Sequence, residues 1–419
     1  MTVHNYLPRV VDNELRERLA RIGAVVVEGP KGCGKTETAV QQCASAVRLD
    51  TDETARVTAE IAPANILEGP TPRLIDEWQL VPSLWNAVRK AVDDRRTPGQ
   101  FILTGSATPV DDPNRHTGTG RMSRLRMRTL SLSESCLSSD QVSLAQLMSG
   151  AGEVAGSSNL SLNDLIEETC HGGWPADREL PWALAQANVA DYCTEVANAD
   201  IRLVDGVRRN TARVRQLMQS LARATDTQTR RTKLAADAAN PPLGEYAVAT
   251  YLDALEKIAV LEPLPSWSPT LRARARIRVA PKHYFVDPAM SAALINMGPD
   301  QLKQDLKTYG SLFKSLVLRD LRVYAQSSGA TIHHYLDSTG LAIDAIVDGG
   351  YGRWGAIAIR LGSVPYQLDK AAADLKILSL KVDTEEAGDP KFLAIITASG
   401  YAYTRPDGVS VIPLATLHP

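Results

Sequence analysis

The sequence contains few aromatic residues, few cysteines and no long apolar run. Phenylalanine, tryptophan and tyrosine make up 5% of the 419 residues, and five residues are cysteine. No CxxC pair occurs among the cysteines, which argues against a zinc site or a disulfide framework. No apolar stretch approaches the ~20 residues that span a bilayer, and the first residues, MTVHNYLPRVVDNELRERLARIG, lack a signal-peptide core. We therefore expect a soluble cytoplasmic protein that makes no membrane contact.

A strong excess of charge of either sign is also absent. The formal net charge is -2, with 46 basic and 48 acidic residues. Any contact with nucleic acid must therefore come from a local basic patch. A chain of 419 residues is long for a single hydrophobic core, so the length predicts about two or three domains.

The stretch VVVEGPKGCGKTETA combines a buried strand with a glycine-rich loop. The pattern GxxxxGK[ST] is matched by Gly29, Pro30, Lys31, Gly32, Cys33, Gly34, Lys35 and Thr36. Residues 24–27 read as a buried strand and residues 36–46 as an amphipathic helix, which is the order of a P-loop. Glycines let backbone N–H groups surround phosphate oxygens where a β-carbon would clash. The stretch predicts a site for ATP and Mg²⁺; the alternative is a glycine-rich turn without a ligand.

Three residues of this loop have predicted roles. Lys35 should reach the β- and γ-phosphates of ATP, and the Thr36 hydroxyl should ligate Mg²⁺. The backbone N–H groups around Cys33 could lower the pKa of its thiol and make it reactive. An inert small residue in the loop is the alternative for Cys33.

A second apolar strand, in PRLIDEWQ (72–79), ends in two carboxylates. Acids at the carboxyl end of a strand lie where α/β sheets bind ligands. Asp76 is predicted to hold the metal, and Glu77 to act as the general base for the attacking water. A third strand, QFILTGS (100–106), ends in hydroxyls. Thr104 or Ser106 either contacts the γ-phosphate or the lytic water, or merely terminates the strand.

These segments together resemble a known family. The P-loop, LIDEWQ, FILTGS and GRMSRLRMRTLSLSE follow one another as in a family of prokaryotic AAA+-type P-loop ATPases whose C-terminal region is of uncharacterised function. The resemblance is most specific over residues 1–135. It implies an ASCE-type core (additional strand, catalytic glutamate) with Glu77 in the catalytic position. It also implies that Arg121, acting in cis or from a neighbouring subunit, stabilises charge on the phosphate. A generic basic loop is the alternative, because five arginines crowd residues 115–128.

The composition divides the chain into three predicted domains. A small, polar stretch at 151–159 reads as a linker. We expect a P-loop domain at 1–150, a helical and winged-helix-like domain at 160–295 and an α/β domain at 296–419. A turn, GGWPA (172–176), breaks the second domain, and its Trp174 is expected to serve packing.

The middle of the chain predicts a DNA-binding unit. Helices at 214–224 and 243–261, joined by a Thr/Ala-rich stretch and followed by an extended segment, have the order of a winged helix, which the resembled family is thought to contain. In LRARARIRV (271–279) a strand would place one basic row on a single face, spaced to meet a phosphate backbone. The row comprises Arg272, Arg274, Arg276 and Arg278. A solvated strand face is the alternative.

The last third resembles a PD-(D/E)XK nuclease that has lost its chemistry. The family's acidic positions and its lysine correspond here to Lys314, Asp344, Ala358 and Arg360. One remaining carboxylate cannot hold a divalent ion against its hydration shell. We expect the fold to persist without nuclease activity, with Asp344 paired to Arg360. Asp320, on the same helix as Lys314, is a weaker candidate for the missing acid.

Two functions follow from the sequence. The first is a Mg-dependent ATPase whose nucleotide state repositions the C-terminal domains, on DNA in one version. The second is a nucleotide-binding scaffold or regulatory interaction module with negligible hydrolysis. The intact Glu77 favours turnover. The sequence leaves open whether the chain forms a homo-oligomer or binds a protein partner.

Overall fold

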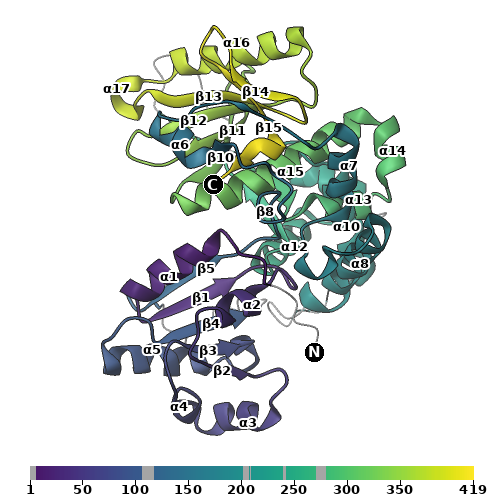
Figure 1. Cartoon of the computed structure of the whole chain (residues 1–419). Helices are drawn as coiled ribbons and strands as arrows, with labels where there is room; N and C mark the ends of the chain where they lie inside the picture. The colour runs from purple at the N-terminus through teal and green to yellow at the C-terminus, as the bar shows by residue number, and fades with distance from the viewer. Residues whose placement is uncertain (1–5, 106–117, 202–206, 208, 239–241, 270–279) are drawn as a thin grey trace.

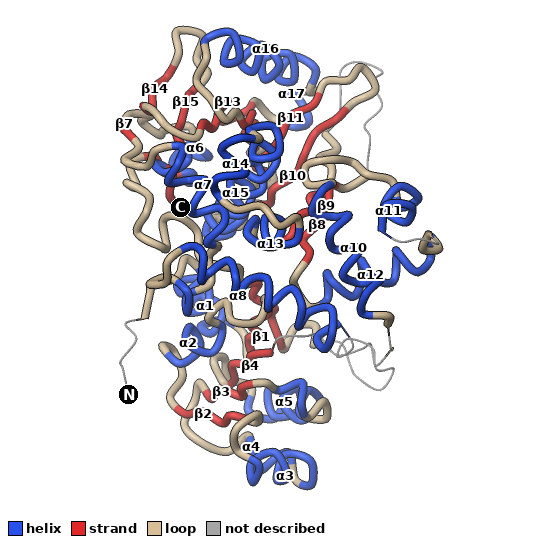
Figure 2. Tube along the Cα trace, turned by 90° about the vertical axis from the view of Figure 1, so that its right-hand side faces the viewer, coloured by secondary structure: helices blue, strands red, loops and turns tan. Residues whose placement is uncertain are grey.

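A computed structural model describes residues 6–105, 118–201, 207, 209–238, 242–269 and 280–419 (Figure 1). A parallel sheet built from the first part of the chain lies at one end of the molecule. A larger sheet built from the last part lies at the other end, with a helical region between them (Figure 2). No helix in the described part of the chain is long and apolar enough to cross a membrane.

The first sheet has five strands that all run parallel. They are β1 (Ala24–Glu28), β2 (Ser45–Arg48), β3 (Arg73–Asp76), β4 (Phe101–Gly105) and β5 (Met122–Arg126). The spatial order is β2-β3-β4-β1-β5, so β4 lies between β1 and β3. This is the additional strand of the predicted core, inserted between the P-loop strand and the strand that carries the acids. The predicted parallel α/β core is confirmed.

Helices cover both faces of this sheet. They are α1 (Val11–Arg21), α2 (Lys35–Val40), α3 (Glu53–Ile61), α4 (Pro63–Ile66), the 3-10 helix η1 (Trp78–Leu80) and α5 (Leu84–Arg95). Because side chains alternate along a strand, Val25 and Val27 pack with α1 and α2, and Val26 packs with α3 to α5. The β-branched run of β1 is therefore buried on both sides, as a central parallel strand requires.

The helix after the P-loop is shorter than expected. The sequence predicts a helix over residues 36–46, but α2 ends at Val40 and β2 begins at Ser45. The backbone N–H of Ala44 donates to the carbonyl of Pro72 at 2.7 Å, and β2 pairs in parallel with β3. The hydrogen bonds of the sheet thus override helix-compatible local sequence.

The middle region is mainly helical. It contains α7 (Leu162–His171), η2 (Pro175–Asp177), α8 (Trp182–Glu195), the π-helix η3 (Val196–Asp200), α10 (Thr211–Arg223), α11 (Arg231–Ala238), α12 (Glu245–Lys257), β8 (Leu261–Leu264), β9 (Lys282–Phe285), α13 (Pro288–Leu294) and α14 (Pro299–Gln304). The expected Thr/Ala-rich joint carries α11, whose Leu234 and Ala238 are buried with α10 and α12. Strands β8 and β9 form an antiparallel pair.

The C-terminal region is built on a mixed sheet in the order β10-β11-β12-β13-β15-β14-β7. Its elements are α15 (Leu306–Ser327), β10 (Thr331–Leu336), β11 (Ala342–Asp348), β12 (Trp354–Ile359), α16 (Pro365–Lys381), α17 (Thr384–Ala387), β13 (Pro390–Thr397), β14 (Tyr401–Thr404), β15 (Ser410–Pro413), η4 (Leu414–Thr416) and β16 (Leu417–His418). Helix α15 packs on one face and α16 on the other. Five residues expected to alternate as buried strand positions are all buried: Ile343, Ala345, Val347, Ile357 and Ile359.

The stretch expected to be a linker belongs to this second sheet. Strand β7 (Gly156–Ser157) pairs with β14, and β6 (Val142–Ser143) pairs with β16. Helix α6 (Leu144–Ser149) lies between them and packs into the apolar core under α15. Leu132 is already part of that core. Residues 151–159 thus carry a strand of the C-terminal sheet in place of the expected linker.

Candidate functional site

The P-loop connects the carboxyl end of β1 to the start of α2. Gly34 precedes α2 with a φ of 99°, in the left-handed region where a side chain is strained. At Gly29, a β-carbon would lie 2.4 Å from the carbonyl oxygen of Met127, so only glycine fits. Gly29, Pro30 and Cys33 are buried and Lys31 is exposed. The loop thus has the close backbone packing that the sequence predicts.

Lys35 and Thr36 lie where a phosphate site requires them. The buried Lys35 ammonium donates to the carbonyls of Gly29 and Pro30 at 3.0 and 2.9 Å. The Thr36 hydroxyl donates to Asp76 Oδ1 at 2.9 Å. The carbonyls of the loop thus accept from the Lys35 ammonium, which could equally donate to phosphate oxygens.

The ends of β3 and β4 bring further predicted residues to the same edge. The fully buried Thr104 hydroxyl donates to Asp76 Oδ1, so one carboxylate oxygen joins Thr36 and Thr104. Glu77 follows Asp76 with a φ of 53°, and the Gln79 amide donates to its carboxylate. Parallel strands place their carboxyl ends together, which explains why residues far apart in sequence meet here.

Other predicted residues lie elsewhere. Arg121 precedes β5, and its carbonyl accepts from the Ala24 amide at the amino end of β1, the edge opposite the P-loop. Its guanidinium donates to Asp93 at 2.8 Å. Arg121 therefore lies away from the P-loop of its own chain. Ser106 and the arginine row at 272–278 lie outside the described residues.

The Cys33 thiol is fully buried and lies in the core with α1 and α2. A buried thiol is poorly accessible to an alkylating reagent, so the structure favours the inert role for Cys33.

A buried ion pair between Arg9 and Glu134 supports the P-loop, and no local sequence pattern predicts it. Arg9 donates through Nε to Glu134 at 3.0 Å and through Nη1 to the carbonyl of Cys33 at 2.7 Å. Glu134 also accepts from the backbone amides of Val10 and Ser131. Since a guanidinium can bond in several directions at once, Arg9 connects the P-loop to the segment that follows β5 in the sequence.

Residues of the middle region also contact the P-loop. The Trp174 indole N–H donates to the Lys31 carbonyl at 3.1 Å, and its ring packs on Tyr192. The Lys31 ammonium contacts Asp200, at the end of η3, at 2.5 Å. Trp174 therefore does more than the packing expected of it. The GGWPA turn was recognisable in the sequence, but the sequence did not indicate that its tryptophan contacts the P-loop.

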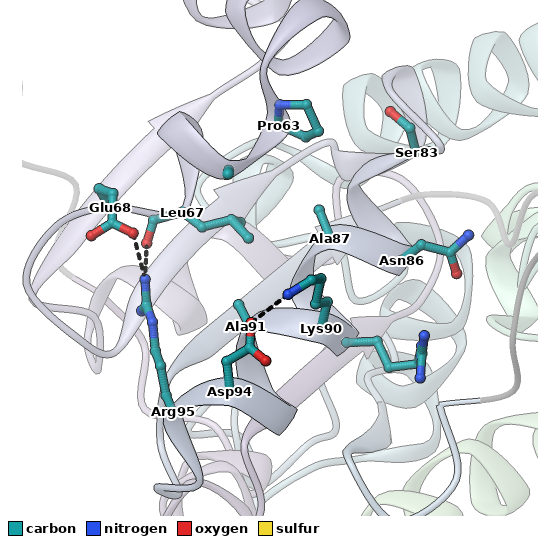
Figure 3. Close-up of a pocket in the computed structure, with 12 residues that line it drawn as sticks. Pro63, Leu67, Glu68, Ser83, Asn86, Ala87, Lys90, Ala91, Asp94 and Arg95 are labelled. Atoms are coloured by element: carbon teal, nitrogen blue, oxygen red, sulfur yellow. Dashed lines mark hydrogen bonds and ion pairs between the residues drawn. The ribbon is translucent and has the colours of Figure 1, made fainter.

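Two further observations concern ligands. In the described part of the chain, no group of three or more His, Cys, Asp or Glu side chains is placed to hold a metal ion. A groove between α4 and α5 (Figure 3) is lined by residues such as Leu67, Ala87 and Arg95, with the Lys90–Asp94 ion pair along its α5 side. None of the predicted site residues lines this groove.

Comparison with known proteins agrees with the geometry. Residues 22–136 match the family model described as an AAA domain, and residues 162–301 match one described as a domain of unknown function (DUF8612). The first match contains the P-loop, Asp76, Glu77 and Thr104. It supports a P-loop, AAA-like ATPase domain at the start of the chain and, with it, ATP binding.

Similar proteins add little on function. An uncharacterized protein of Mycobacterium tuberculosis and another of Mycobacterium bovis are each 24% identical over 317 residues, which are 73% of this chain and 64% of theirs. The chain thus spans less than two thirds of the length of these relatives. The Walker-type ATPase PABY2304 of Pyrococcus abyssi is a similar solved structure, with a TM-score of 0.40 and 12% identity over 70% of this chain and 97% of that one.

Proposed function

We propose that the protein is a Mg-dependent ATPase whose nucleotide state moves the regions that follow residue 136. One observation carries the proposal: Lys35, Thr36, Asp76 and Thr104 meet at the carboxyl edge of a parallel sheet, with Glu77 beside them. The AAA-domain match over the same residues supports it.

Each residue has a chemical task in this proposal. The Lys35 ammonium exchanges its two loop carbonyls for oxygens of the β- and γ-phosphates. Thr36 and Asp76 offer hard oxygen ligands 2.9 Å apart, which suit Mg²⁺. Bound Mg²⁺ would neutralise charge on the phosphates. Glu77 accepts a proton from the attacking water, and its carboxylate, which accepts from the Gln79 amide in this structure, turns towards that water for this step.

The proposal needs no arginine from the same chain. Arg121 is half exposed at the opposite edge of the sheet, so it reaches a phosphate only in a neighbouring copy. The proposed role of Arg121 in stabilising phosphate charge therefore requires a homo-oligomer, in which Arg121 of one copy reaches the nucleotide of the next.

The route from nucleotide to the rest of the molecule runs through Lys31. Its carbonyl accepts from Trp174 and its ammonium contacts Asp200, both of which belong to the middle region. When phosphate enters the loop, a shift of this carbonyl strains or releases both contacts. A ligand moves an equilibrium only through such differential contacts.

ATP turnover of the wild type and of Glu77→Gln, with and without DNA, tests the proposal. The amide keeps the size of the carboxylate but accepts no proton, so turnover should fall by roughly 10²- to 10⁴-fold. ATP affinity should stay within about threefold, since Glu77 acts on the water and not on the nucleotide. The exposed Glu37→Gln, on α2, is the matched control. Equal turnover in wild type and Glu77→Gln would refute this catalytic assignment.

One observation favours the second candidate, a nucleotide-binding scaffold. Glu77 is held by Gln79 and has a φ in the left-handed region, which costs a non-glycine residue on the order of 1 kcal/mol. If this arrangement persists with ATP bound, the site binds nucleotide without activating water. Saturable ATP binding without turnover in the wild type would establish this reading.

We propose further that α10, α11, α12, β8 and β9 form a winged helix. Three helices followed by an antiparallel strand pair support this. The third helix, α12, exposes Glu245 and Asp253 beside Lys257, so it repels phosphate. DNA binding would therefore depend on the arginine row at 272–278, and it stays a prediction.

We propose that the C-terminal region is a nuclease-like domain without the metal ligands; a helix packed on a mixed sheet supports this. Asp344 is bonded to Arg360 at 3.0 Å, which confirms that predicted pair, and Ala358 is buried against α16. Asp320 is fully buried with Arg319, so it does not replace Lys314. We propose that the protein does not cleave DNA; incubation with plasmid in Mg²⁺ or Mn²⁺ checks this, and cleavage lost in Asp344→Ala would refute it.

A further inference from the structure

A cluster of charged side chains joins segments that are far apart in the sequence. Asp226 lies in the loop after α10, Lys282 on β9, Lys314 on α15 and Asp344 on β11, while Arg360 follows β12. We call these five residues the Asp226–Asp344 cluster. Two of them belong to the middle region and three to the C-terminal region.

Lys314 stands at the centre of the cluster. Its ammonium lies 2.7 Å from a carboxylate oxygen of Asp226 and 2.7 Å from one of Asp344. The two oxygens therefore lie at most about 5.4 Å apart, close enough to repel each other strongly if the cation were absent.

The remaining carboxylate oxygens also have partners. Asp226 Oδ1 accepts from Lys282 at 2.7 Å and from the Tyr284 hydroxyl at 2.9 Å. Asp344 Oδ2 accepts from Arg360 at 3.0 Å and from the Ile359 amide at 2.8 Å. Both carboxylates are thus fully satisfied, as buried charges must be.

The cluster is mostly shielded from water. The side chains of Asp226 and Asp344 are 15% and 14% exposed, and that of Lys314 is 24% exposed. Burial opposes the ionisation of Asp344, but Lys314 and Arg360 outweigh it and hold the pKa of this carboxyl below its ordinary value. Burial likewise opposes the charge on Lys314, and the two carboxylates hold its pKa above the ordinary value.

The backbone conformation of Asp226 indicates that its side-chain contacts determine the conformation of the loop after α10. Asp226 has a φ of 66°, in the left-handed region that aspartate tolerates better than most residues but still at a cost. The surrounding contacts must supply the energy that keeps a residue there. Lys282, Tyr284 and Lys314 converge on this one side chain.

We propose that the Asp226–Asp344 cluster is a latch that docks the middle region onto the C-terminal region, with the Lys314 ammonium as a tethered cation between two carboxylates. In a metal site a divalent ion takes this place and is exchangeable. A cation fixed to α15 does not exchange with the solvent, so this contact needs no metal ion. The latch does not depend on the proposed ATPase activity.

Hydrogen exchange of the full chain tests the latch through four variants. Lys314→Met removes the cation and leaves two carboxylates facing each other, so amides at 224–228 and 282–285 should exchange roughly tenfold faster or more. Asp226→Asn keeps the size and the tolerance of positive φ but loses the charge, and should give a smaller increase. Lys307→Met, on an exposed lysine of the same helix, is the matched control and should match the wild type.

The double variant Lys314→Met/Asp226→Asn decides the question. It removes the repulsion between Asp226 and Asp344, so its exchange should be slower than that of Lys314→Met alone. Exchange in the double variant as fast as in Lys314→Met, or no change in Lys314→Met, would overturn the latch. If Lys314→Met does not fold, Asp226→Asn serves alone, and wild-type exchange in it is the overturning result. ATP affinity, measured in parallel, should be unchanged in every folded variant.

Discussion

Two lysine side chains occupy comparable positions in two very different sites. Lys35, in the P-loop, donates to the carbonyls of Gly29 and Pro30 at 3.0 and 2.9 Å. Lys314, in the Asp226–Asp344 cluster, contacts two carboxylates at 2.7 Å each. Both ammonium groups are bonded to oxygen, but only one set of oxygens carries full negative charge.

This difference in charge distinguishes a site that can bind an anion, at Lys35, from a structural contact between two regions, at Lys314. A phosphate oxygen carries formal negative charge and a carbonyl oxygen only a partial one, so an incoming phosphate can displace the carbonyls from the Lys35 ammonium. The same phosphate would have to displace two carboxylates to reach Lys314, and would leave both of them uncompensated. The P-loop lysine can therefore bind an incoming anion, whereas the lysine of the Asp226–Asp344 cluster is already neutralised by two carboxylates of the same chain.

Replacing Lys35 should have the largest effect among the tests of this comparison. Lys35→Ala should weaken ATP binding at least about 100-fold, because charged hydrogen bonds to phosphate contribute on the order of 3 kcal/mol. Lys90→Ala, at an exposed lysine of α5, is the matched control. Calorimetry measures both affinities. Equal affinity for wild type and Lys35→Ala would mean that nucleotide does not bind in this loop.

Acidification should lower the stability of the part of the fold that contains the Asp226–Asp344 cluster. Burial lowers the pKa of His334 to about 4, from an unfolded value of 6.5, and burial also lowers the pKa of His283 and His333. A depressed pKa stabilises the fold above pH 6.5, and this contribution is lost as the pH falls from 6.5 towards 4. The loss should be on the order of 3 kcal/mol for His334, because its side chain is fully buried and one pKa unit corresponds to about 1.4 kcal/mol.

Thermal unfolding between pH 7.5 and pH 4.5 measures this loss. His334→Gln keeps a donor for the Ala280 carbonyl that His334 contacts at 3.1 Å, yet does not titrate. Its melting temperature should therefore fall less than that of the wild type over this range. A parallel fall in both proteins would assign the acid sensitivity to other groups.

The contact between Trp174 and the P-loop should give the smallest effect. Trp174→Phe keeps the ring against Tyr192 but removes the N–H that donates to the Lys31 carbonyl. A neutral hydrogen bond contributes about 1 kcal/mol, so ATP affinity should change by roughly fivefold. Trp182→Phe, on α8, is the control, and titration of a fluorescent ATP analogue is the measurement. Unchanged affinity would show that the middle region does not sense the loop through Trp174.

Local pattern was sufficient to predict the nucleotide site. Strand, loop and helix are contiguous in sequence, and the rule that parallel strands end at one edge brings Asp76 and Thr104 to Lys35. The pairing of Asp344 with Arg360 was also predictable, because neighbouring strands place those positions together. In each case the geometry follows from secondary structure alone.

The residues that sequence reasoning missed meet only through long-range packing. Arg9 comes before the first sheet in the sequence and Glu134 after it, and Asp226 reaches Lys314 from a loop with no regular periodicity. Helix α2 ended early because β2 pairs with β3, a contact invisible in a local window. The position of Arg121 at the opposite edge of the sheet was not predictable, because its arginine-rich surroundings do not indicate which edge it occupies.

The pairing of β7 with β14 and of β6 with β16 has a consequence for how the protein is made. Residues 142–157 leave the ribosome long before residues 401–418, so two short strands must wait for partners that do not yet exist. The first sheet can close early, whereas the second sheet closes only when its last strands arrive. Gene fragments cut at residue 160 would separate these partners, so neither half would carry a complete second sheet. Residues 142–157 and the last strands therefore form one interwoven unit, which cannot be exchanged by cutting and joining at residue 160.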